Sequence, residues 1–350
     1  MLKVLAFTRY TKLGASSRLR FYQYINEAKN YNIELEPSPL FNEDYIDRLY
    51  SGKGRSLQIV FFSYIKRFFK LFTVYKYDLI IIEKELFPYF PGLFENILYL
   101  IKKKYIVDYD DAVFHLYDQS KNFFVRFLSK KIDLIMFRSN LVLCGNEYIA
   151  QRAKVVNANK IKIIPTVVDI NKYFVSKKKI VGAVVIGWIG NPSTVHLLEM
   201  VRDSLNTLSQ RFDIVLHVIG AHFDSSVFKV NCINWDEDTE VRSIQEIDIG
   251  IMPLNDGPFE RGKCGYKLIQ YMACGKPVVA SPVGVNKKMV RESNAGYLAL
   301  NENDWTQVLS ELCQSEDLRI KYGYEAREYI EKYYSMQIML PTFANAINTL

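Results

Sequence analysis

Short apolar runs alternate with longer amphipathic stretches along the whole chain. An apolar run bounded by turn residues is typical of a strand that is buried on both faces. Strands that alternate with helical patterns predict βαβ units and parallel sheets. In the first half the predicted strands are Lys3–Thr8, Asp78–Glu83, Lys104–Asp110, Leu141–Gly145 and Ile161–Thr166. In the second half they are Gly182–Gly190, Ile214–Gly220, Asp248–Leu254, Pro277–Ser281 and Gly296–Leu300.

The periodic pattern is lost near residues 165–181, where PTVVDINKYFVSKKK ends in three lysines, and the strand series then restarts. We therefore predict an α/β protein with two Rossmann-like domains, 1–170 and 182–335, that face each other across a cleft. Ligands of such folds bind at the carboxyl ends of the strands. The final segments, 325–334 and 336–350, have the pattern of two helices with a break near Ser335.

Composition adds a charge asymmetry to this picture. The chain has 350 residues, of which 49% are hydrophobic and 14% aromatic. These values exclude a disordered chain and fit two domains. The net charge is +7, and residues 1–165 hold 26 Lys and Arg against 16 Asp and Glu, whereas residues 166–350 hold 19 against 22. A basic first half indicates an anionic partner such as phosphates, nucleic acid or a membrane surface.

Three other features indicate a cytoplasmic protein. The apolar run between Lys3 and Arg9 is too short for the core of a signal peptide. No segment reaches the roughly 18 uncharged apolar residues of a membrane-spanning helix. The five cysteines form no CxxC pair and the four histidines are scattered, so we predict neither a disulfide framework nor a metal site.

The segment from Arg48 to Tyr77 contains basic and aromatic residues and no acidic residue. Its basic residues are Arg48, Lys53, Arg55, Lys66, Arg67, Lys70 and Lys76. On a helix, an apolar face would contain Ile65, Phe68, Phe69 and Phe72. A basic, aromatic, amphipathic helix is suited to lie on an anionic bilayer, and we predict this contact for residues 61–76. The alternative is that the phenylalanines pack inward. No nucleic-acid motif accompanies them, so we expect no nucleic-acid partner.

Two candidate sites follow strands of the first half. After Lys3–Thr8 comes a loop of small residues that leads into a helix, where free backbone amides favour anions. The residues that could bind an anion there are Gly14, Ser17, Arg18 and Arg20. The alternative is a capped helix with solvated arginines. After the third predicted strand, Asp108, Asp110 and Asp111 lie so close in sequence that their repulsion can raise one pKa toward that of a base. His115 follows and is more often structural than catalytic.

The second half has the sharper signals, in glycine-rich turns and in the stretch YKLIQYMACGKPVVASPVG. Lys267 and Gln270 lie on one face of a helix that otherwise has apolar residues. A diphosphate is the natural partner for a lysine at a helix start, and an amide can reach ribose hydroxyls. The residues expected to bind the diphosphate and its nucleoside are Gly190, Asn191, Gly220, Arg261, Lys263, Tyr266, Lys267 and Gln270.

These motifs resemble those of the GT-B glycosyltransferases of family 4, which are retaining enzymes that use nucleotide sugars. The resemblance is carried by DIGIMPL, YKLIQYMACGKPVVASPVGVN and NAGYLA, with weaker matches at GASSRLR, DYDDA, CGNEYIA and IIPTVVD. It implies that the first domain holds the acceptor, with Gly14, Ser17, Arg18, Arg20 and His115 as contacts, and that the second holds the donor. It also implies that residues 336–350 cross back to the first domain.

The chain departs from the family at two positions. Many members have two glutamates eight residues apart, and here these positions are Gly262 and Gln270. Asp256, Glu260 and Lys263 are candidates to contact the donor sugar instead.

The resulting prediction is a metal-independent hexosyltransferase of bacterial surface polysaccharide synthesis, peripheral on the inner face of the cytoplasmic membrane. We expect Asp110, Asp111 and Lys267 to be its catalytic residues and expect no cofactor. Two alternatives are a nucleotide-sugar epimerase of the same fold and a nucleotide-sugar-binding module without activity.

Overall fold

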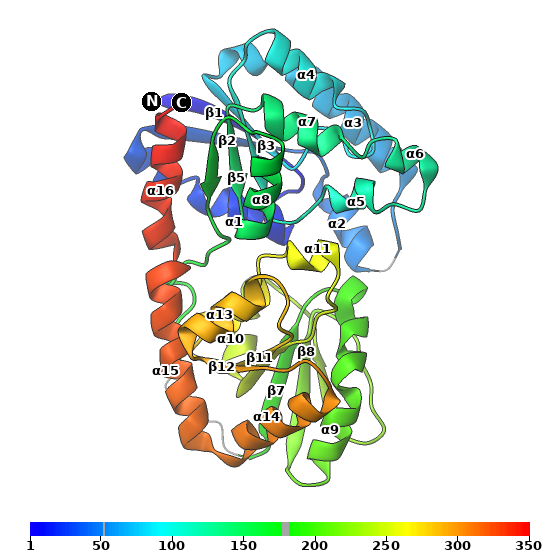
Figure 1. Cartoon of the computed structure of the whole chain (residues 1–350), viewed down its shortest axis with the longest axis vertical. Helices are drawn as coiled ribbons and strands as arrows, with labels where there is room; N and C mark the ends of the chain where they lie inside the picture. Colours follow the sequence, from blue (N-terminus) through cyan, green and yellow to red (C-terminus); the bar gives the residue numbers. More distant parts are fainter. Residues whose placement is uncertain (52, 177–181) are drawn as a thin grey trace. The chain divides into compact units, whose positions relative to one another are not determined.

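The computed structural model describes residues 1–51, 53–176 and 182–350, so the linker lysines Lys177, Lys178 and Lys179 lie outside the described residues. The chain divides into two compact units. We call Met1–Thr166, Arg261–Cys264 and Met339–Leu350 unit 1, and Val167–Glu260 with Gly265–Ile338 unit 2. Each unit contains one parallel sheet with helices (Figure 1). The predicted α/β class with two such sheets is therefore confirmed.

The sheet of unit 1 has six parallel strands in the order β2-β1-β3-β4-β5-β6. The strands are β1 (Leu2–Thr8), β2 (Ile33–Pro39), β3 (Leu79–Glu83), β4 (Tyr105–Tyr109), β5 (Leu141–Cys144) and β6 (Ile161–Ile163). All five predicted strands of the first half are present. Strand β2 was not predicted, because its residues are alternately buried and exposed at the start and it includes two prolines.

The helices of unit 1 surround a core that alternate residues of β1, β3, β4 and β5 form. They are α1 (Ala15–Arg20), η1 (Tyr22–Tyr24), η2 (Glu27–Tyr31), α2 (Glu43–Tyr50), α3 (Leu57–Leu71), η3 (Val74–Lys76), α4 (Leu93–Leu100), α5 (His115–Asp118), α6 (Phe123–Arg126), α7 (Lys131–Arg138) and α8 (Glu147–Val155). Here η denotes a 3-10 helix.

Helix α3 contains most of the predicted membrane-binding segment. Ser56 caps its first turn by accepting a hydrogen bond from the Ile59 amide. Four phenylalanines of this helix and the residue after it, Phe61, Phe62, Phe69 and Phe72, are each at least 60% exposed, so they do not pack inward. Arg67 does not fit the membrane contact predicted for residues 61–76. It is buried and donates to the carbonyls of Thr8 and Ser38, which it reaches because its side chain lies on the inner face of the helix.

The sheet of unit 2 also has six parallel strands, in the order β12-β11-β10-β7-β8-β9. The strands are β7 (Val184–Ile189), β8 (Ile214–Ile219), β9 (Lys229–Ile233), β10 (Ile249–Met252), β11 (Val278–Ala280) and β12 (Gly296–Leu298). All five predicted strands of the second half are present, and β9 at the edge was not predicted. The strand order reverses between β7 and β10, which is where ligands bind in open α/β sheets.

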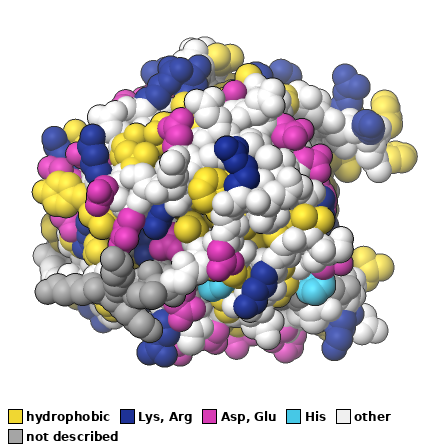
Figure 2. All heavy atoms as spheres, turned by 90° about the horizontal axis from the view of Figure 1, so that it is seen from below, with side chains coloured by type: hydrophobic (Ala, Val, Ile, Leu, Met, Phe, Trp, Pro, Cys, Tyr) yellow, Lys and Arg dark blue, Asp and Glu magenta, His cyan; other side chains and the backbone are white. Residues whose placement is uncertain are grey.

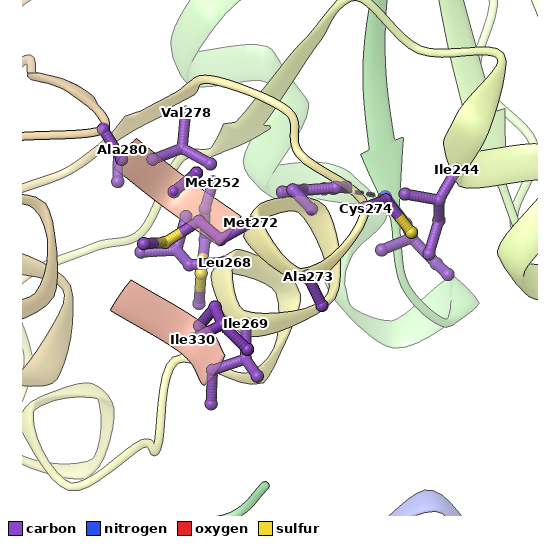
Figure 3. Packing of buried hydrophobic residues seen from close by; sticks show 14 of the residues in the cluster. Ile244, Met252, Leu268, Ile269, Met272, Ala273, Cys274, Val278, Ala280 and Ile330 are labelled. Atoms are coloured by element: carbon purple, nitrogen blue, oxygen red, sulfur yellow. Dashed lines mark hydrogen bonds between the residues drawn. The ribbon is translucent and has the colours of Figure 1, made fainter. Parts of the chain in front are cut away.

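Helices cover both faces of this second sheet. They are η4 (Pro192–Val201), α9 (Arg202–Ser209), α10 (Glu240–Gln245), α11 (Pro258–Arg261), α12 (Tyr266–Ala273), α13 (Val285–Ser293), α14 (Glu302–Gln314) and α15 (Glu316–Tyr333). Helix α12 packs its apolar residues Leu268, Ile269 and Met272 on one face of the sheet (Figure 3). This packing fixes the direction of the polar residues of the same helix.

The chain ends in α16 (Met336–Asn348), and the predicted break near Ser335 is confirmed between α15 and α16. Met336–Ile338 belong to unit 2, whereas residues from Met339 onward belong to unit 1. In unit 1, Phe343 stacks on Tyr24 with ring centroids 4.8 Å apart, and Asn348 donates to the Tyr31 carbonyl. The last helix thus contributes residues to both units.

One face of the molecule has hydrophobic side chains scattered among acidic and basic ones (Figure 2). Among the described residues, no helix has the length and apolar content that crossing a membrane requires.

Candidate functional site

Two glycines bring the loops after β7 and β8 together in unit 2. Gly220 has a φ of 87°, and a Cβ at this position would lie 2.4 Å from the Gly190 carbonyl oxygen. The Gly190 amide donates to the Ile219 carbonyl, and the Gly220 amide donates to Ile233. Because neither residue has a side chain, the two loops approach each other closely at the carboxyl ends of these strands.

The side chain of Lys267 lies beside this glycine pair. Its Nζ atom is 4.0 Å from the centroid of the buried Trp188 ring, on β7. A Cβ at position 190 would lie 2.8 Å from the same Nζ atom, so a larger residue there would displace the ammonium. An ammonium over an indole face is stabilised by the ring quadrupole. The structure therefore brings together the candidates Gly190, Gly220 and Lys267.

Gln270 lies one turn further along α12 and is 3% exposed. Its Nε2 atom donates to the Tyr173 hydroxyl over 3.3 Å, and that hydroxyl lies 3.1 Å from the Tyr266 hydroxyl. The Tyr173 hydroxyl also donates to Glu240, which accepts a second bond from the Trp235 indole over 2.5 Å. Burial raises the pKa of Tyr173 well above its ordinary value, so Tyr173 remains protonated. We expected Gln270 to reach ribose directly; in this structure its amide orients a tyrosine instead.

Asn191 occupies the first position before η4, as the sequence predicts for a cap. Its Oδ1 atom accepts from the Ser193 amide over 3.1 Å and from the Ser193 hydroxyl over 2.6 Å. The residue therefore fixes the turn that follows Gly190.

Arg261 and Lys263 fall in a short segment that belongs to unit 1, whereas Lys267 belongs to unit 2. Asn146 holds this segment, because its Nδ2 atom donates to the Gly262 carbonyl over 2.7 Å and to the Lys263 carbonyl over 3.3 Å. A Cβ at Gly262 would lie 2.2 Å from the Cβ of Ala112. A glutamate at this position would therefore clash with Ala112 within unit 1.

Buried ion pairs lie at the carboxyl ends of the strands in unit 1. Arg20 forms a two-pronged pair with Asp108, with nitrogen–oxygen distances of 2.9 and 2.6 Å, and it donates to the Ile164 carbonyl. Lys131 pairs with Glu85 at 2.6 Å. We expected Arg20 to contact an acceptor. Two of its guanidinium nitrogens instead pair with the buried carboxylate of Asp108, inside the protein.

Asp110 and Asp111 share one cation, Lys84. The Lys84 Nζ atom lies 3.0 Å from Asp110 and 3.5 Å from Asp111. Burial raises the pKa of Asp110, but Lys84 and a hydrogen bond from Ser16 outweigh burial and lower it below the ordinary value. Burial and the neighbouring charge of Asp110 raise the pKa of Asp111. The side chain of Asp111 is 30% exposed, against 8% for Asp110. The two aspartates thus have opposite pKa shifts.

The other acceptor candidates have mainly structural contacts. A Cβ at Gly14 would lie 2.4 Å from the Tyr10 Cβ, so the glycine permits close packing. Ser17 is fully buried and donates to Glu83 over 2.6 Å. Arg18 is buried and its Nη1 atom lies 3.4 Å from the Lys12 carbonyl. His115 uses both ring nitrogens, at 2.7 Å from Asp118 and 2.9 Å from the Tyr148 hydroxyl. The polar atoms of Ser17 and His115 thus already have partners within the protein, so these residues are less suited to contact an acceptor than the sequence predicts.

Across the described ranges, no group of three or more His, Cys, Asp and Glu side chains is arranged to hold a metal ion.

Comparison with known proteins identifies the second half of the chain. Residues 183–315 match the family model described as glycosyl transferases group 1. The matched residues include all six strands of the unit 2 sheet. No curated protein sequence gives a significant match.

Solved structures match the whole chain. Sucrose-phosphate synthase (tll1590) from Thermosynechococcus elongatus is 12% identical with a TM-score of 0.72, and the match covers 100% of this chain and 99% of that one. Anabaena Alr3699/HepE in complex with UDP-glucose is 14% identical with a TM-score of 0.71 and full coverage of both chains. WaaG, described as a glycosyltransferase involved in lipopolysaccharide biosynthesis, is 12% identical with a TM-score of 0.66, covering 99% of each chain. The chain therefore has the GT-B fold.

Sequence reasoning missed several residues of both sites. Glu83 ends an apolar strand and Lys84 follows it, and both were overlooked because no motif marks them. Their position at the carboxyl end of that predicted strand is the signal that could have identified them. Trp188, Tyr173 and Glu240 are far from Lys267 in sequence, and only the folded chain brings them together.

Proposed function

We propose that this protein is a retaining glycosyltransferase that moves a sugar from a nucleoside diphosphate sugar to a hydroxyl of a glycan or lipid-linked acceptor. The observation that carries the proposal is the Lys267 ammonium over Trp188, beside Gly190, in a glycosyl transferases group 1 domain. The UDP-glucose in the Anabaena structure and the lipopolysaccharide role of WaaG support a nucleotide-sugar donor and a bacterial surface polysaccharide such as capsule or O-antigen.

The proposed role of Lys267 is to stabilise the leaving diphosphate. The bond from the anomeric carbon to the diphosphate oxygen breaks while a bond to the acceptor oxygen forms, so negative charge grows on the diphosphate. A fixed ammonium and a backbone amide at that point stabilise the transition state. We assign this role to Lys267 with the amide of Asn191, and we propose Arg261 and Lys263 as further cations. In this scheme the protein supplies the positive charge and no metal is required.

The acceptor proton also needs a destination. In a retaining reaction the acceptor enters on the face from which the diphosphate leaves, so the leaving phosphate can take the proton. We propose that Asp110 or Asp111 orients the acceptor hydroxyl or assists as base.

The decisive experiment compares Lys267→Ala with Lys287→Ala, a variant of an exposed lysine in the next helix, α13. Donor hydrolysis and transfer are measured with a panel of UDP-, GDP- and ADP-sugars, with and without a chelator. We expect Lys267→Ala to lower kcat by about 10²–10³-fold, the usual cost of losing one group that stabilises transition-state charge. Lys287→Ala and the chelator should have no effect.

Two outcomes would contradict the proposal. Turnover of Lys267→Ala equal to that of wild type would remove the lysine from the site. Donor binding in a thermal-shift assay without any turnover in the wild type would instead favour a binding module.

We also propose that α3 of unit 1 lies on an anionic membrane surface, as expected for an enzyme with a lipid-linked acceptor. Besides the exposed phenylalanines of α3, the exposed side chains of Phe123, Phe124 and Phe127 belong to α6 and the residue after it. No acidic residue occurs in 49–77 or 119–132. Exposed aromatic residues flanked only by basic charge suit a bilayer with negative headgroups.

Vesicle sedimentation tests this contact. We expect wild type to sediment with vesicles of phosphatidylglycerol and phosphatidylcholine and to remain in solution with phosphatidylcholine alone. The double variant Phe61→Ser/Phe69→Ser should lose at least about tenfold in affinity, since each buried CH₂ contributes roughly 0.8 kcal/mol. The control is Tyr324→Ser/Tyr333→Ser, which changes two exposed tyrosines of α15. Equal binding by both double variants would exclude α3 as the contact.

A further inference from the structure

Glu83, the last residue of β3, is a buried carboxyl that the proposed mechanism does not use. It is 1% exposed. Its Oε2 atom accepts from the Arg9 amide over 2.7 Å and from the Ser17 hydroxyl over 2.6 Å. The residue therefore joins the end of β3 to the loop after β1 and to the first turn of α1.

The other oxygen of Glu83 shares a hydroxyl with Asp110. The Ser16 Oγ atom lies 2.8 Å from Glu83 Oε1 and 2.6 Å from Asp110 Oδ2. A serine hydroxyl has one hydrogen, so it can donate to only one of these two oxygens. The second contact is favourable only if the other carboxyl supplies a hydrogen of its own. One of the two acids must therefore be protonated for both contacts to be hydrogen bonds.

The positions of the cations decide which acid holds this hydrogen. Each neighbouring carboxylate has a cation within ion-pair distance, and these carboxylates are Glu85, Asp108, Asp110 and Asp111. Glu83 has no such cation among the residues that the structure describes. A buried carboxyl without a cation favours its neutral form. In agreement, burial raises the pKa of Glu83 above its ordinary value.

We infer that Glu83 is protonated in the folded protein, that its Oε1–H donates to the Ser16 hydroxyl, and that Ser16 donates in turn to Asp110. This chain makes Glu83 a positioning residue. Asp110 then has the Lys84 ammonium 3.0 Å from its Oδ1 atom and the Ser16 hydroxyl at Oδ2, and it remains an anion.

The consequence for the acceptor rests on the proposed function. Of the two aspartates, Asp111 is the more exposed and shares only the longer contact with Lys84. We assign to Asp111, rather than Asp110, the hydrogen bond from the acceptor hydroxyl. Asp110 instead fixes Lys84 and the Ser16 turn. The function proposed for the pair is thereby divided between an orienting residue and a residue that holds the site together.

The charged and titratable groups that surround Glu83 come from several elements. They are Arg9 after β1, Tyr22 in η1, Arg67 in α3, Lys84 after β3 and Asp110 after β4. Of these, Asp110 favours the protonated form of Glu83, whereas Lys84 and the hydrogen bond from the Arg9 amide oppose it.

Infrared spectroscopy of the full chain tests the protonation directly. A protonated carboxyl has a carbonyl stretch that is separate from the carboxylate bands. We expect the wild-type spectrum minus the Glu83→Gln spectrum at neutral pH to contain this band, because glutamine has no carboxyl. The matched control is Glu85→Gln, since Glu85 is paired with Lys131 and Arg9, and its difference spectrum should lack the band. Absence of the band for Glu83→Gln would overturn the inference.

Ser16→Ala keeps the test decisive if Glu83→Gln fails to fold. Removing the hydroxyl takes away the group that accepts from Glu83, so the carbonyl band should shift relative to wild type. An unshifted spectrum would show that Glu83 does not donate to Ser16.

Kinetics test the second step separately. Glutamine can donate to Ser16 as the protonated acid does, so Glu83→Gln should keep kcat within about threefold, whereas Asp111→Asn should lower it at least about 10²-fold. A tenfold loss in Glu83→Gln, or wild-type kcat in Asp111→Asn, would refute the assigned roles. The infrared result does not depend on turnover, so it separates failure of this inference from failure of the proposed function.

Discussion

The two units place different chemistry at the same location, the carboxyl ends of a parallel sheet. In unit 1 the charged groups neutralise one another inside the protein, as in the Arg20–Asp108 and Lys131–Glu85 pairs. In unit 2 two glycines let the loops after β7 and β8 approach each other, and Lys267 lies over an aromatic ring beside them. We therefore expect substitutions in the first cluster to act mainly on folding, and we propose that substitutions of Lys267 act mainly on the binding of an anion.

The largest effect should come from unpairing a buried charge in unit 1. Arg20→Leu leaves the Asp108 carboxylate buried without its cation, and we expect a loss of about 3–5 kcal/mol in the free energy of unfolding. Denaturant titration measures it. The double variant Arg20→Leu/Asp108→Leu should recover most of the loss because no charge then remains unpaired. A loss below about 1 kcal/mol in the single variant would break the comparison, since Lys267→Met in unit 2 is expected to cost no more than that.

Restoring the family glutamate at position 262 should be costly because of contacts in unit 1. In Gly262→Glu the new Cβ collides with Ala112, and we expect a loss of about 1–3 kcal/mol in unfolding free energy, typical of overpacking. Thermal unfolding measures the loss. Ala112→Gly in the same chain should recover part of it. If Gly262→Glu alone is as stable as wild type, steric exclusion does not explain the departure from the family.

The hydrogen-bond network around Tyr173 in unit 2 should respond more weakly. Tyr173→Phe removes the hydroxyl that Gln270, Tyr266 and Glu240 share, and leaves the buried Gln270 amide without this acceptor. We expect a loss of about 1–2 kcal/mol in denaturant titration. The control is Tyr324→Phe, which changes an exposed tyrosine of unit 2. Equal stability of the two variants would show that this network does not hold α12 in place.

The smallest effect should come from an exposed pair in unit 1. A hydrogen bond and charge from Lys70 lower the pKa of Glu36. A lowered carboxyl pKa stabilises the fold above the unfolded-state pKa, and this contribution disappears as the pH falls through the folded-state pKa. Glu36→Gln should therefore cost about 0.2–1 kcal/mol at neutral pH and nothing below the folded-state pKa of Glu36. A loss that persists in acid would point to packing rather than charge.

The fold was largely predictable because central strands carry continuous apolar runs, as β3 and β10 do. The missed strands, β2 and β9, lie at sheet edges, where one side of the strand lacks a neighbour and polar residues are tolerated. A search for apolar runs therefore finds the interior strands and the edge strands β6 and β12, and it overlooks the more polar edge strands β2 and β9.

The candidate sites were less predictable than the fold. Lys267 was identified because a cation is unusual within an apolar helix. The role of Lys84 depends on its left-handed backbone, with a φ of 64°, and on Asp110 and Asp111 more than 20 positions away. Neither condition can be read from the residues around Lys84, because both arise only when β3 and β4 pair.

The hydrogen bonds from Asn146 to the Gly262 and Lys263 carbonyls affect how this chain can be recombined with its relatives. A tetrapeptide encoded late in the gene completes a unit encoded mostly at its beginning. A chimaera that joined the front half of this chain to the back half of a relative would place the relative's version of this tetrapeptide against Ala112. Exchange of the back half between relatives therefore requires that those four residues remain compatible with the recipient.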